Sequence, residues 1–294
     1  MPAARAAAQA KVNLRLRVLT QESSGYHQIE TVFQRLDLAD EVTIRVGAAG
    51  RSIDCTGDTI PPAGLGAPEQ NLAYRAAAAY QAAAGWPDGF AIEIVKRIPV
   101  GGGLGGGSAD AGAVLRMLDA MAPRPMGVRV LELAARLGAD VAFMATETPL
   151  AFAWGRGERM LGLTPLPRRR VQLVVPEFAI GTADAYRWLS ASRPAYEPTG
   201  ALLPAAALLS WDEVAAVAEN DFEAAVTQQH PRIGVYRDAL ARAGAKVAML
   251  SGSGSTVFGV FADGARGLLA ADIPDARLME TRTSVHVVPV RLIE

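Results

Sequence analysis

The chain has 294 residues, of which half are hydrophobic and a fifth are charged, and its formal net charge is −1. The length suits two domains, and the composition is ordinary for a soluble globular protein. The near-neutral charge excludes a general attraction to nucleic acid or to an anionic membrane, and no apolar stretch reaches the roughly 18 residues of a membrane helix. Cys55 is the only cysteine, which excludes an internal disulfide and a thiolate metal cluster and favours a reducing cytoplasm.

The first predicted elements are strands. Residues 1–10 are rich in alanine and lack the long apolar core of a signal peptide, so we expect a frayed N-terminus there. From residue 11 to residue 18, apolar and polar residues alternate as in a strand with one polar face. Lys11 and Asn13 are therefore expected to point the same way. Further strands are expected at about 40–46, 51–55 and 90–95.

Two helices are predicted among these strands. Asn71 is expected to cap an alanine-rich helix that ends at Gly85. A second helix is expected from about 126 to 137, because Gly138 follows as a stop signal. The first region of the chain is therefore mixed α/β.

Residues 99–110 are the most informative segment of the chain. They read Pro-Val-Gly-Gly-Gly-Leu-Gly-Gly-Gly-Ser-Ala-Asp. Glycine costs conformational entropy when it is ordered, so such a cluster indicates that the backbone itself approaches a ligand, most plausibly a phosphate chain. A strand precedes the segment, and apolar residues at helical spacing follow Ser108. We therefore expect a phosphate loop that opens a helix, whose N-terminal amides favour an anion.

Two better-known glycine patterns fit this segment less well. Gly101, Gly103 and Gly106 satisfy G-x-G-x-x-G, but the preceding strand alternates with charged residues, unlike the buried parallel strand of a dinucleotide-binding fold. A Walker A loop needs Lys-Ser or Lys-Thr after its last glycine, whereas Ser108 follows Gly107 directly. A flexible glycine linker would not explain Leu104 within the run or the closely flanking strand and helix.

The second half of the chain begins after an irregular segment. Residues 164–170 combine two prolines with three arginines and indicate a crossing to a second domain, so we expect domains over 1–160 and 161–294. A strand is expected at 171–175, and helices are expected near 182–190, 212–228 and 231–243. Two strands joined at Ser251–Ser255 follow, then a last helix and a strand at 286–292. His230 and His286 match no metal-ligand spacing and are interpreted as structural.

The glycine segment and four other motifs resemble those of the GHMP kinases, ATP-dependent kinases of small molecules. The motifs are Ala10-Lys11-Val12-Asn13-Leu14, Gly25-Tyr26-His27 with Thr31-Val32-Phe33, Pro99 to Asp110, Leu137-Gly138-Ala139-Asp140-Val141 and Ser251 to Ser255. The triple glycine before Ser108 is similar to the phosphate loop of one branch of the family, the kinases that phosphorylate 4-diphosphocytidyl-2-C-methyl-D-erythritol. The chain departs from the pattern at Ala142, where proline is usual, at Ala109, where a second serine is common, and at Gly101-Gly102, where the loop usually opens with an alanine.

The resemblance runs from residue 10 to about residue 260 and implies an α+β, two-domain GHMP kinase fold. The implied N-terminal domain is like one in a small-subunit ribosomal protein, and the implied C-terminal domain is ferredoxin-like. The implied reaction is ATP-dependent phosphorylation of the 2-hydroxyl of the cytidylyl alcohol, with Mg²⁺ on the phosphates. A GHMP kinase for another small alcohol, or a nucleotide-binding sensor without transfer activity, are the alternatives. The implied protein is cytoplasmic, a monomer or a homodimer, and its partner is a small-molecule substrate rather than nucleic acid or membrane.

The resemblance also implies the catalytic pair. Asp140 would be the base that accepts the proton of the attacking hydroxyl, and Lys11 would offset the charge. The sequence contains lysine only at positions 11, 96 and 246, which sets Lys11 apart from the many arginines. The alternatives are a solvated strand lysine and a carboxylate that merely caps a helix.

The remaining site residues follow from the same motifs. The ATP-binding residues would be Pro99, Val100, Gly101, Gly102, Gly103, Leu104, Gly105, Gly106, Gly107, Ser108 and Ala109. Ser108 could assist the Mg²⁺ that ATP brings, and no other metal ligand is predicted. The acceptor-binding residues would be Asn13, Tyr26, His27, Thr182 and Tyr186, with core packing of Tyr186 nearly as well supported. Asn71 could contact adenine besides capping its helix, Ser251–Ser255 could be a second clamp, and Asn220–Glu223 would have a supporting role.

Overall fold

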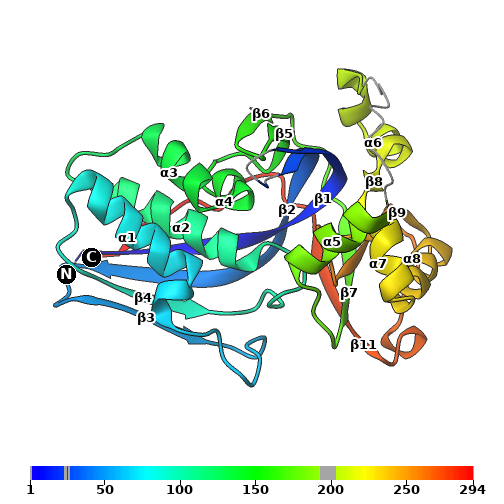
Figure 1. The fold of residues 1–294 in the computed structure, drawn as a ribbon, viewed down its shortest axis with the longest axis horizontal. Coiled ribbons are helices and arrows are strands. Elements are labelled where there is room, and N and C mark those ends of the chain that lie inside the picture. The colour runs from blue at the N-terminus through cyan, green and yellow to red at the C-terminus, as the bar shows by residue number, and fades with distance from the viewer. Residues whose placement is uncertain (1, 23–24, 26, 193–202, 294) are drawn as a thin grey trace.

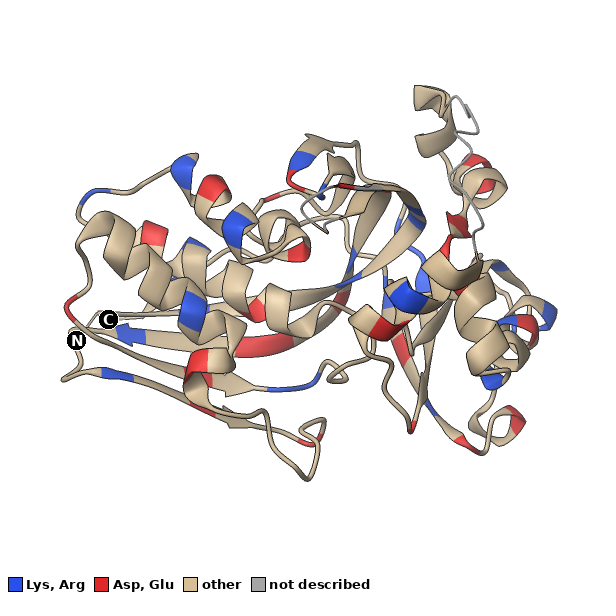
Figure 2. Ribbon diagram, viewed as in Figure 1, with Lys and Arg blue, Asp and Glu red and all other residues tan. Residues whose placement is uncertain are grey.

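A computed structural model describes residues 2–22, 25, 27–192 and 203–293 of the chain. Two sheets lie along the long axis of the molecule, with helices α1 to α4 beside the first sheet and helices α5, α7 and α8 beside the second (Figure 1). Acidic and basic residues are interspersed over both parts (Figure 2). Within the described residues, no helix is long and apolar enough to cross a membrane.

The first sheet has eight strands among the described residues, and its main path runs in the order β12-β1-β2-β4-β3. Its strands are β1 (Ala3–Gln21), β2 (His27–Val46), β3 (Arg51–Thr56), β4 (Phe90–Val95), β5 (Leu150–Gly155), β6 (Arg159–Gly162), β8 (Glu219–Asn220) and β12 (Arg291–Ile293). Burial alternates along β4, because Phe90, Ile92 and Ile94 face the core while their neighbours are more exposed.

The helices of this part are α1 (Leu72–Ala84), α2 (Gly106–Met121), α3 (Arg129–Leu137) and α4 (Ala139–Met144), with a short 3-10 turn at Pro68–Gln70. Asn71 caps α1 by accepting a hydrogen bond from the Ala73 amide, 2.8 Å away, and Gly85 ends that helix with a left-handed conformation. The sequence prediction of this helix is confirmed at both ends.

The expectation of a frayed N-terminus was wrong. Residues 3–10 are the first half of β1, and Ala4, Ala6, Ala8 and Ala10 are buried in the first core. Alanine has a low strand propensity and gives little hydrophobic contrast, so the alternation was not recognised. Its small side chain suits this position, because β1 runs beneath helix α2 in the same core.

The second sheet has the order β11-β7-β10-β9. Its strands are β7 (Arg170–Pro176), β9 (Ala245–Leu250), β10 (Val257–Phe261) and β11 (Ala276–Arg282). The helices of this part are α5 (Thr182–Ser192), α6 (Trp211–Val217), α7 (Phe222–Gln229) and α8 (Arg232–Arg242), with 3-10 turns at Ala205–Leu208 and Ala270–Asp272.

Three sequence expectations in this part are corrected. The helix expected over 212–228 is split into α6 and α7, because Glu219–Asn220 become extended and pair with β1. The expected last helix is only the 3-10 turn at Ala270–Asp272, and β11 was missed. The strand expected at 286–292 is the three-residue β12, which returns to pair with β1 in the first sheet. The expected division into 1–160 and 161–294 stays a prediction.

The β1–β2 hairpin contributes to both hydrophobic cores. Leu14 and Val32 belong to the core beneath α2, whereas Leu16, Val18 and Ile29 belong to the core formed with α5, α7 and α8. Its pairing register shifts between Gln9 and Lys11 and again between Asn13 and Arg15, in the middle of this ribbon. Such bulges re-aim side chains where two packing environments meet.

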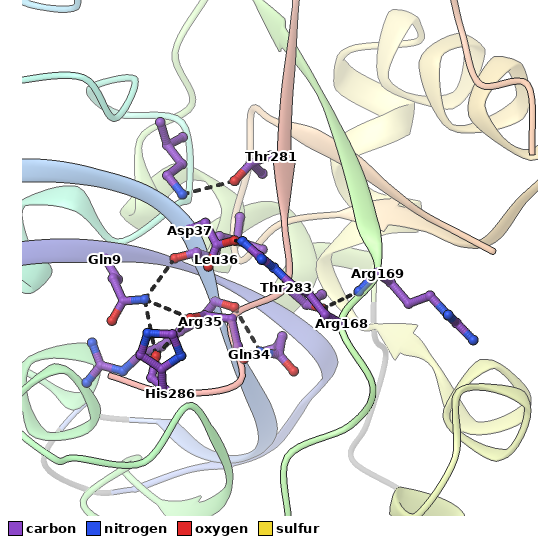
Figure 3. Close-up of polar contacts among 12 residues, drawn as sticks. Gln9, Gln34, Arg35, Leu36, Asp37, Arg168, Arg169, Thr281, Thr283 and His286 are labelled. Atoms are coloured by element: carbon purple, nitrogen blue, oxygen red, sulfur yellow. Dashed lines mark hydrogen bonds and ion pairs between the residues drawn. The ribbon is translucent and has the colours of Figure 1, made fainter. Parts of the chain in front are cut away.

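The chain segment after β11 ties the two sheets together (Figure 3). The side-chain amide of Gln9 donates to Ser284 Oγ at 2.9 Å, and that of Gln34 donates to the Ser284 carbonyl oxygen at 2.9 Å. The Arg169 amide donates to Thr283 Oγ1 at 2.9 Å. These contacts hold β1 and β2 against the chain segment that leaves the second sheet.

Candidate active site

A cleft of about 1530 Å³ lies between the two parts of the molecule. It is lined by the glycine segment, the start of α4, one side of α5 and the loop between β9 and β10. With the exceptions of Ala109, which is buried beneath the loop, and Tyr26, which lies outside the described residues, the predicted site residues line this cleft. The structure therefore brings together motifs that are up to about 240 residues apart in sequence.

The glycine segment connects β4 to α2 and has the conformation that only glycine adopts readily. Gly101, Gly103 and Gly105 have positive φ angles of 75°, 77° and 70°. Helix α2 begins at Gly106, and the Ala109 amide makes the first helical hydrogen bond, to the Gly105 carbonyl oxygen at 2.8 Å. The amides of residues 106–108 precede that ladder and open into the cleft, which is the arrangement that binds phosphate at a helix N-terminus.

The second glycine loop, residues 251–255, packs directly on the first. A Cβ atom on Gly103 would lie 2.1 Å from the Ser251 carbonyl oxygen, so a larger residue has no space there. Ser251 Oγ donates to the Gly103 carbonyl oxygen at 3.0 Å, and the Thr256 amide donates to the Gly102 carbonyl oxygen at 3.1 Å. The expected contact between the two loops is present.

Residues 220–223 hold the second loop in place, as their expected supporting role requires. Asn220 Nδ2 donates to the carbonyl oxygens of Leu250 and Gly252, each at 2.8 Å. The Leu250 amide donates to Glu223 Oε2 at 2.8 Å. Because Asn220 also pairs with β1, the loop position is fixed relative to the first sheet.

Lys11 and Asp140 meet at the floor of the cleft. Lys11 Nζ lies 3.4 Å from Asp140 Oδ2, 2.8 Å from Asn13 Oδ1 and 3.0 Å from the Gly103 carbonyl oxygen. An ammonium has three hydrogens to donate, so these three acceptors fix its position. The Lys11 side chain is 4% exposed, whereas that of Asp140 is 34% exposed and reaches the cleft.

Both alternative interpretations of this pair are wrong. Lys11 is not solvated, and Asp140 does not cap α4: Gly138 occupies the cap position and Asp140 lies in the first turn. Asn13 is bound on both sides, because its Nδ2 donates to Thr31 Oγ1 at 2.7 Å, and Thr31 Oγ1 donates to the Arg15 carbonyl oxygen at 2.8 Å. Its contacts make Asn13 a support for Lys11. Thr31 belongs to one of the sequence motifs, but sequence reasoning had not assigned it a role.

An aromatic surface lies at the other end of the cleft. The rings of His27 and Tyr186 stack with centroids 4.3 Å apart, and Phe222 packs edge-on against Tyr186 at 4.8 Å. Tyr186 therefore packs on the second core and also lines the cleft. Burial lowers the pKa of His27, so its imidazole is neutral at pH 7 and has one donor and one acceptor. Burial and the nearby Asp140 raise the pKa of Tyr186 to about 12.

The hydroxyl of Thr182 lies beside this surface. Thr182 Oγ1 is 3.2 Å from Ser253 Oγ, and both residues line the cleft. Thr182 and Tyr186 thus share one side of α5, as their spacing predicts.

A buried charge cluster behind the phosphate loop was missed in the sequence. Lys96 Nζ donates to Asp110 Oδ2 at 2.7 Å and to Asp40 Oδ2. Asp40 Oδ1 accepts from the amides of Arg97 and Ile98 at 2.5 and 2.8 Å. The cluster therefore connects the end of β4 to the first turns of α2, on either side of the loop.

The electrostatics of this cluster follow from its burial. Burial and Asp40 raise the pKa of Asp110 to about 7 against the opposing effect of Lys96. The pKa of Lys96 is also raised, because Asp110 and Asp40 together outweigh the effect of burial. Asp110 Oδ1 has no hydrogen-bond partner. The rarity of lysine was the available signal for Lys96, but its partners come from two other elements.

No group of three or more histidine, cysteine, aspartate or glutamate side chains gathers around a common point in the described part of the chain. The chain therefore offers no all-protein metal cage there. Ser108 lines the cleft at the end of the phosphate loop, where its hydroxyl is an oxygen ligand of the kind that Mg²⁺ accepts beside phosphate oxygens.

Comparisons with known proteins agree with this geometry. Two family models match the chain: the GHMP kinases N terminal domain over residues 71–148 and GHMP kinases C terminal over residues 202–274. The fold and the site thus define a GHMP kinase, and this class implies the use of ATP. A crystal structure of homoserine kinase from Cytophaga hutchinsonii, 18% identical, covers 99% of this chain and 97% of its own with a TM-score of 0.71, which supports the fold.

The more similar relatives belong to one branch of this class. The 4-diphosphocytidyl-2-C-methyl-D-erythritol kinase of Pelotomaculum thermopropionicum is 40% identical and covers 88% of this chain and 89% of its own. That of Moorella thermoacetica is 39% identical, with 93% and 94% covered. A crystal structure of 4-(cytidine 5'-diphospho)-2C-methyl-D-erythritol kinase is 35% identical, has a TM-score of 0.75 and covers 95% of this chain and 99% of its own. The chain belongs to the 4-diphosphocytidyl-2-C-methyl-D-erythritol kinase family.

Proposed function

We propose that this protein transfers the γ-phosphoryl group of ATP to the 2-hydroxyl of 4-diphosphocytidyl-2-C-methyl-D-erythritol, in the non-mevalonate route to isoprenoid precursors. The observation that carries the proposal is the Lys11–Asp140 ion pair, whose ammonium also binds the Gly103 carbonyl oxygen of the glycine segment. A candidate base and a phosphate-binding backbone thus meet at one point. The acceptor is suggested by the names of the relatives.

In this mechanism Asp140 accepts the proton of the acceptor hydroxyl. A bond forms from that oxygen to the γ-phosphorus while the bond to the ADP oxygen breaks, so the proton remains on Asp140 and ADP leaves. Lys11, 3.4 Å from the carboxylate, keeps Asp140 ionised before transfer and stabilises the developing charge on the acceptor oxygen. Such transfers depend mainly on positioning and charge neutralisation, which these two paired side chains supply at the floor of the cleft.

The glycine segment holds the phosphates of ATP. The open amides of residues 106–108 supply donors, and the close packing of Gly103 on Ser251 keeps the loop in that conformation. When bound, Mg²⁺ would neutralise phosphate charge, and Ser108 would hold it through its hydroxyl. Asn71 lines the same cleft on the adenine side, where its Oδ1 caps α1 and its Nδ2 donates to Cys55 Sγ at 3.8 Å.

His27, Tyr186 and Thr182 bind the cytosine end of the acceptor, with Tyr26 as a further contact. The stacked rings of His27 and Tyr186 offer an aromatic face, and the neutral imidazole offers one donor and one acceptor for the edge of a base. The lone cysteine and the biosynthetic reaction fit a cytoplasmic protein, and a monomer or a homodimer is expected.

A phosphoryl-transfer assay with purified protein tests this proposal. With ATP and Mg²⁺, mass spectrometry should detect the gain of one phosphoryl group on the cytidylyl acceptor. Mevalonate and homoserine are the matched control acceptors, because their kinases share the class. Equal turnover of either control would overturn the acceptor assignment, and nucleotide binding without any transfer would favour a sensor.

A further inference from the structure

Arg35 of β2 is the largest fully buried side chain among the described residues, with an exposed fraction of 1%. A buried guanidinium normally pairs with a carboxylate, because an unpaired charge is costly inside a protein. No carboxylate in the part of the chain that the structure describes pairs with Arg35. Burial, with a smaller contribution from Arg116, lowers its pKa to about 9, which shows that the site places this cation in an unfavourable environment.

The partners of the Arg35 side chain are Met144 Sδ, at 3.5 Å from Nη1, and backbone carbonyl oxygens at the end of α4 and in the turn that follows it. Its Nη2 donates to the carbonyl oxygens of Phe143, Met144 and Thr146 at 3.0, 3.1 and 3.0 Å, and its Nε donates to that of Thr148 at 3.2 Å. The guanidinium also lies 4.8 Å from the centroid of the Phe143 ring. The last carbonyls of a helix lack helical partners and form its negative end, so a cation is favourable there.

The other end of α4 carries Asp140, which Lys11 holds. Lys11 and Arg35 are direct partners in the ladder between β1 and β2. Two neighbouring cations of one hairpin therefore bind the two ends of the same six-residue helix. A helix of this length does not persist without tertiary contacts, so its position depends on what holds its ends.

The backbone of Arg35 is fixed as well. Its amide donates to the Pro149 carbonyl oxygen at 2.8 Å, and its carbonyl oxygen accepts from the Ser284 amide at 2.9 Å. Ser284 belongs to the segment that ties the two sheets together (Figure 3). Arg35 thus connects the junction of the two sheets to the helix that carries Asp140.

We propose that Arg35 is a positioning residue for Asp140: by binding the carbonyl end of α4 it sets the place of the carboxylate beside Lys11. The inference rests on the proposed function, in which Asp140 is the base. A displacement of about 1 Å at a reacting group can lower a rate by about 100-fold. If α4 is held at one end only, the Asp140 carboxylate should be displaced and phosphoryl transfer should be slower. Arg35 itself touches neither substrate.

Arg35→Lys and Arg35→Met test this role, with Arg116→Met as the matched control. A lysine has one ammonium and cannot bind four carbonyls in a fork geometry, so we expect kcat to fall by about 10- to 100-fold while KM for ATP stays within about twofold. Arg116 is also partly buried, and its charge is near enough to lower the pKa of Arg35, but its hydrogen bond goes to the Val288 carbonyl oxygen at 2.6 Å rather than to a carbonyl of α4. Its variant should lower the melting temperature and leave kcat unchanged. Unchanged kcat in folded Arg35→Lys would overturn the proposal.

Combining Arg35→Lys with Asp140→Asn separates positioning from a general loss of stability. If Arg35 acts through the carboxylate, its substitution should lower kcat by less than about twofold in the Asp140→Asn background. An equal loss in both backgrounds would contradict the proposal. Hydrogen exchange gives a second readout that needs no activity: the amides of α4 should exchange faster in Arg35→Lys than in Arg116→Met.

The two hypotheses fail in different ways. Full activity of Asp140→Asn would overturn the proposed base, whereas hydrogen exchange would still report whether Arg35 holds α4. Unchanged protection of α4 in Arg35→Lys would overturn the positioning role even if Asp140 proves essential. If Arg35→Met does not fold, Arg35→Lys and the exchange measurement decide the question.

Discussion

Lys11 and Lys96 are both buried, with side chains 4% and 5% exposed, but their partners differ. Lys11 pairs with one carboxylate, Asp140, which is 34% exposed to the cleft. Lys96 pairs with Asp40 and Asp110, whose side chains are 0% and 4% exposed. The partner of the first ammonium is partly exposed to the cleft, whereas both partners of the second are buried, although Lys96 and Asp110 lie against the same cleft beneath the phosphate loop.

This difference teaches that burial alone does not identify a reacting lysine. An enclosed ammonium between two carboxylates satisfies charges that folding has already desolvated, and removing it leaves them uncompensated. An ammonium whose partner opens into a cleft can also act on charge that develops during a reaction. The comparison predicts that substitutions at Lys11 and Asp140 change turnover, whereas substitutions at Lys96 change stability first.

The largest effect is expected at the open pair. Asp140→Asn removes the base and preserves its shape, so kcat should fall by about 10²- to 10⁴-fold with little change in ATP affinity. Lys11→Met should behave similarly. Steady-state kinetics and nucleotide titration measure both quantities, and near-normal turnover in both variants would mean that the site has been misplaced.

At the enclosed lysine we expect a loss of stability. Lys96→Met leaves two buried carboxylates without their cation and should lower the free energy of unfolding by about 3–5 kcal/mol, measured by denaturant titration. Lys246→Met is the matched control, because Lys246 is exposed and pairs with Asp212 at the surface, where a pair contributes at most about 1 kcal/mol. If Lys96→Met keeps full stability but loses turnover, the distinction between the two lysines fails.

A change away from both lysines should affect one substrate only. His27→Ala removes the imidazole that we propose to hydrogen-bond to the edge of the cytosine base. We therefore expect the affinity for the cytidylyl acceptor to fall about tenfold while ATP binding is unchanged. Titrating cytidylyl and uridylyl analogues against both proteins should reveal a narrower preference in the variant. An unchanged preference would show that the base is read elsewhere.

The smallest effect concerns pH at the enclosed cluster. The pKa of Asp110 is raised to about 7 in the folded protein, so the folded state keeps a proton that the unfolded state has already released. Protonated Asp110 therefore makes its full contribution to the free energy of unfolding below the pKa of the unfolded state. That contribution is lost as the pH rises through about 7. Between pH 6 and pH 8, the free energy of unfolding of the wild type should fall by about 1 kcal/mol more than that of Asp110→Asn, as measured by denaturant titration at each pH. Parallel pH profiles would contradict the raised pKa.

The sequence predicted the parts of the site that are local in the chain. Glycine density and its flanking strand and helix predicted the phosphate loop, and alternation predicted that Lys11 and Asn13 share a face. The motifs also predicted the family, which the comparisons confirm. The roles of the individual site residues stay predictions.

What could not be predicted depends on contacts between distant elements. The partners of Lys96 come from β2 and α2, and no periodicity links those positions. Arg35 follows the polar Gln34 in a part of β2 where polar and apolar residues do not alternate, and only the tertiary position of α4 makes it a buried helix cap. The break between α6 and α7 arises because Asn220 pairs with β1, a tertiary contact that overrides the helical pattern.

The two-stranded ribbon of β1 and β2 is a rigid element that both cores share. Its strands of 19 and 20 residues span about 60 Å at roughly 3.3 Å per residue. The ribbon passes from one core to the other within two residues, between Leu14 and Leu16. Bending the ribbon would break hydrogen bonds between the two strands, and the backbone N–H and C=O groups involved would find no other partner inside the protein. We therefore expect the two cores to move as one body, with adjustments to bound substrates confined to the rim of the cleft.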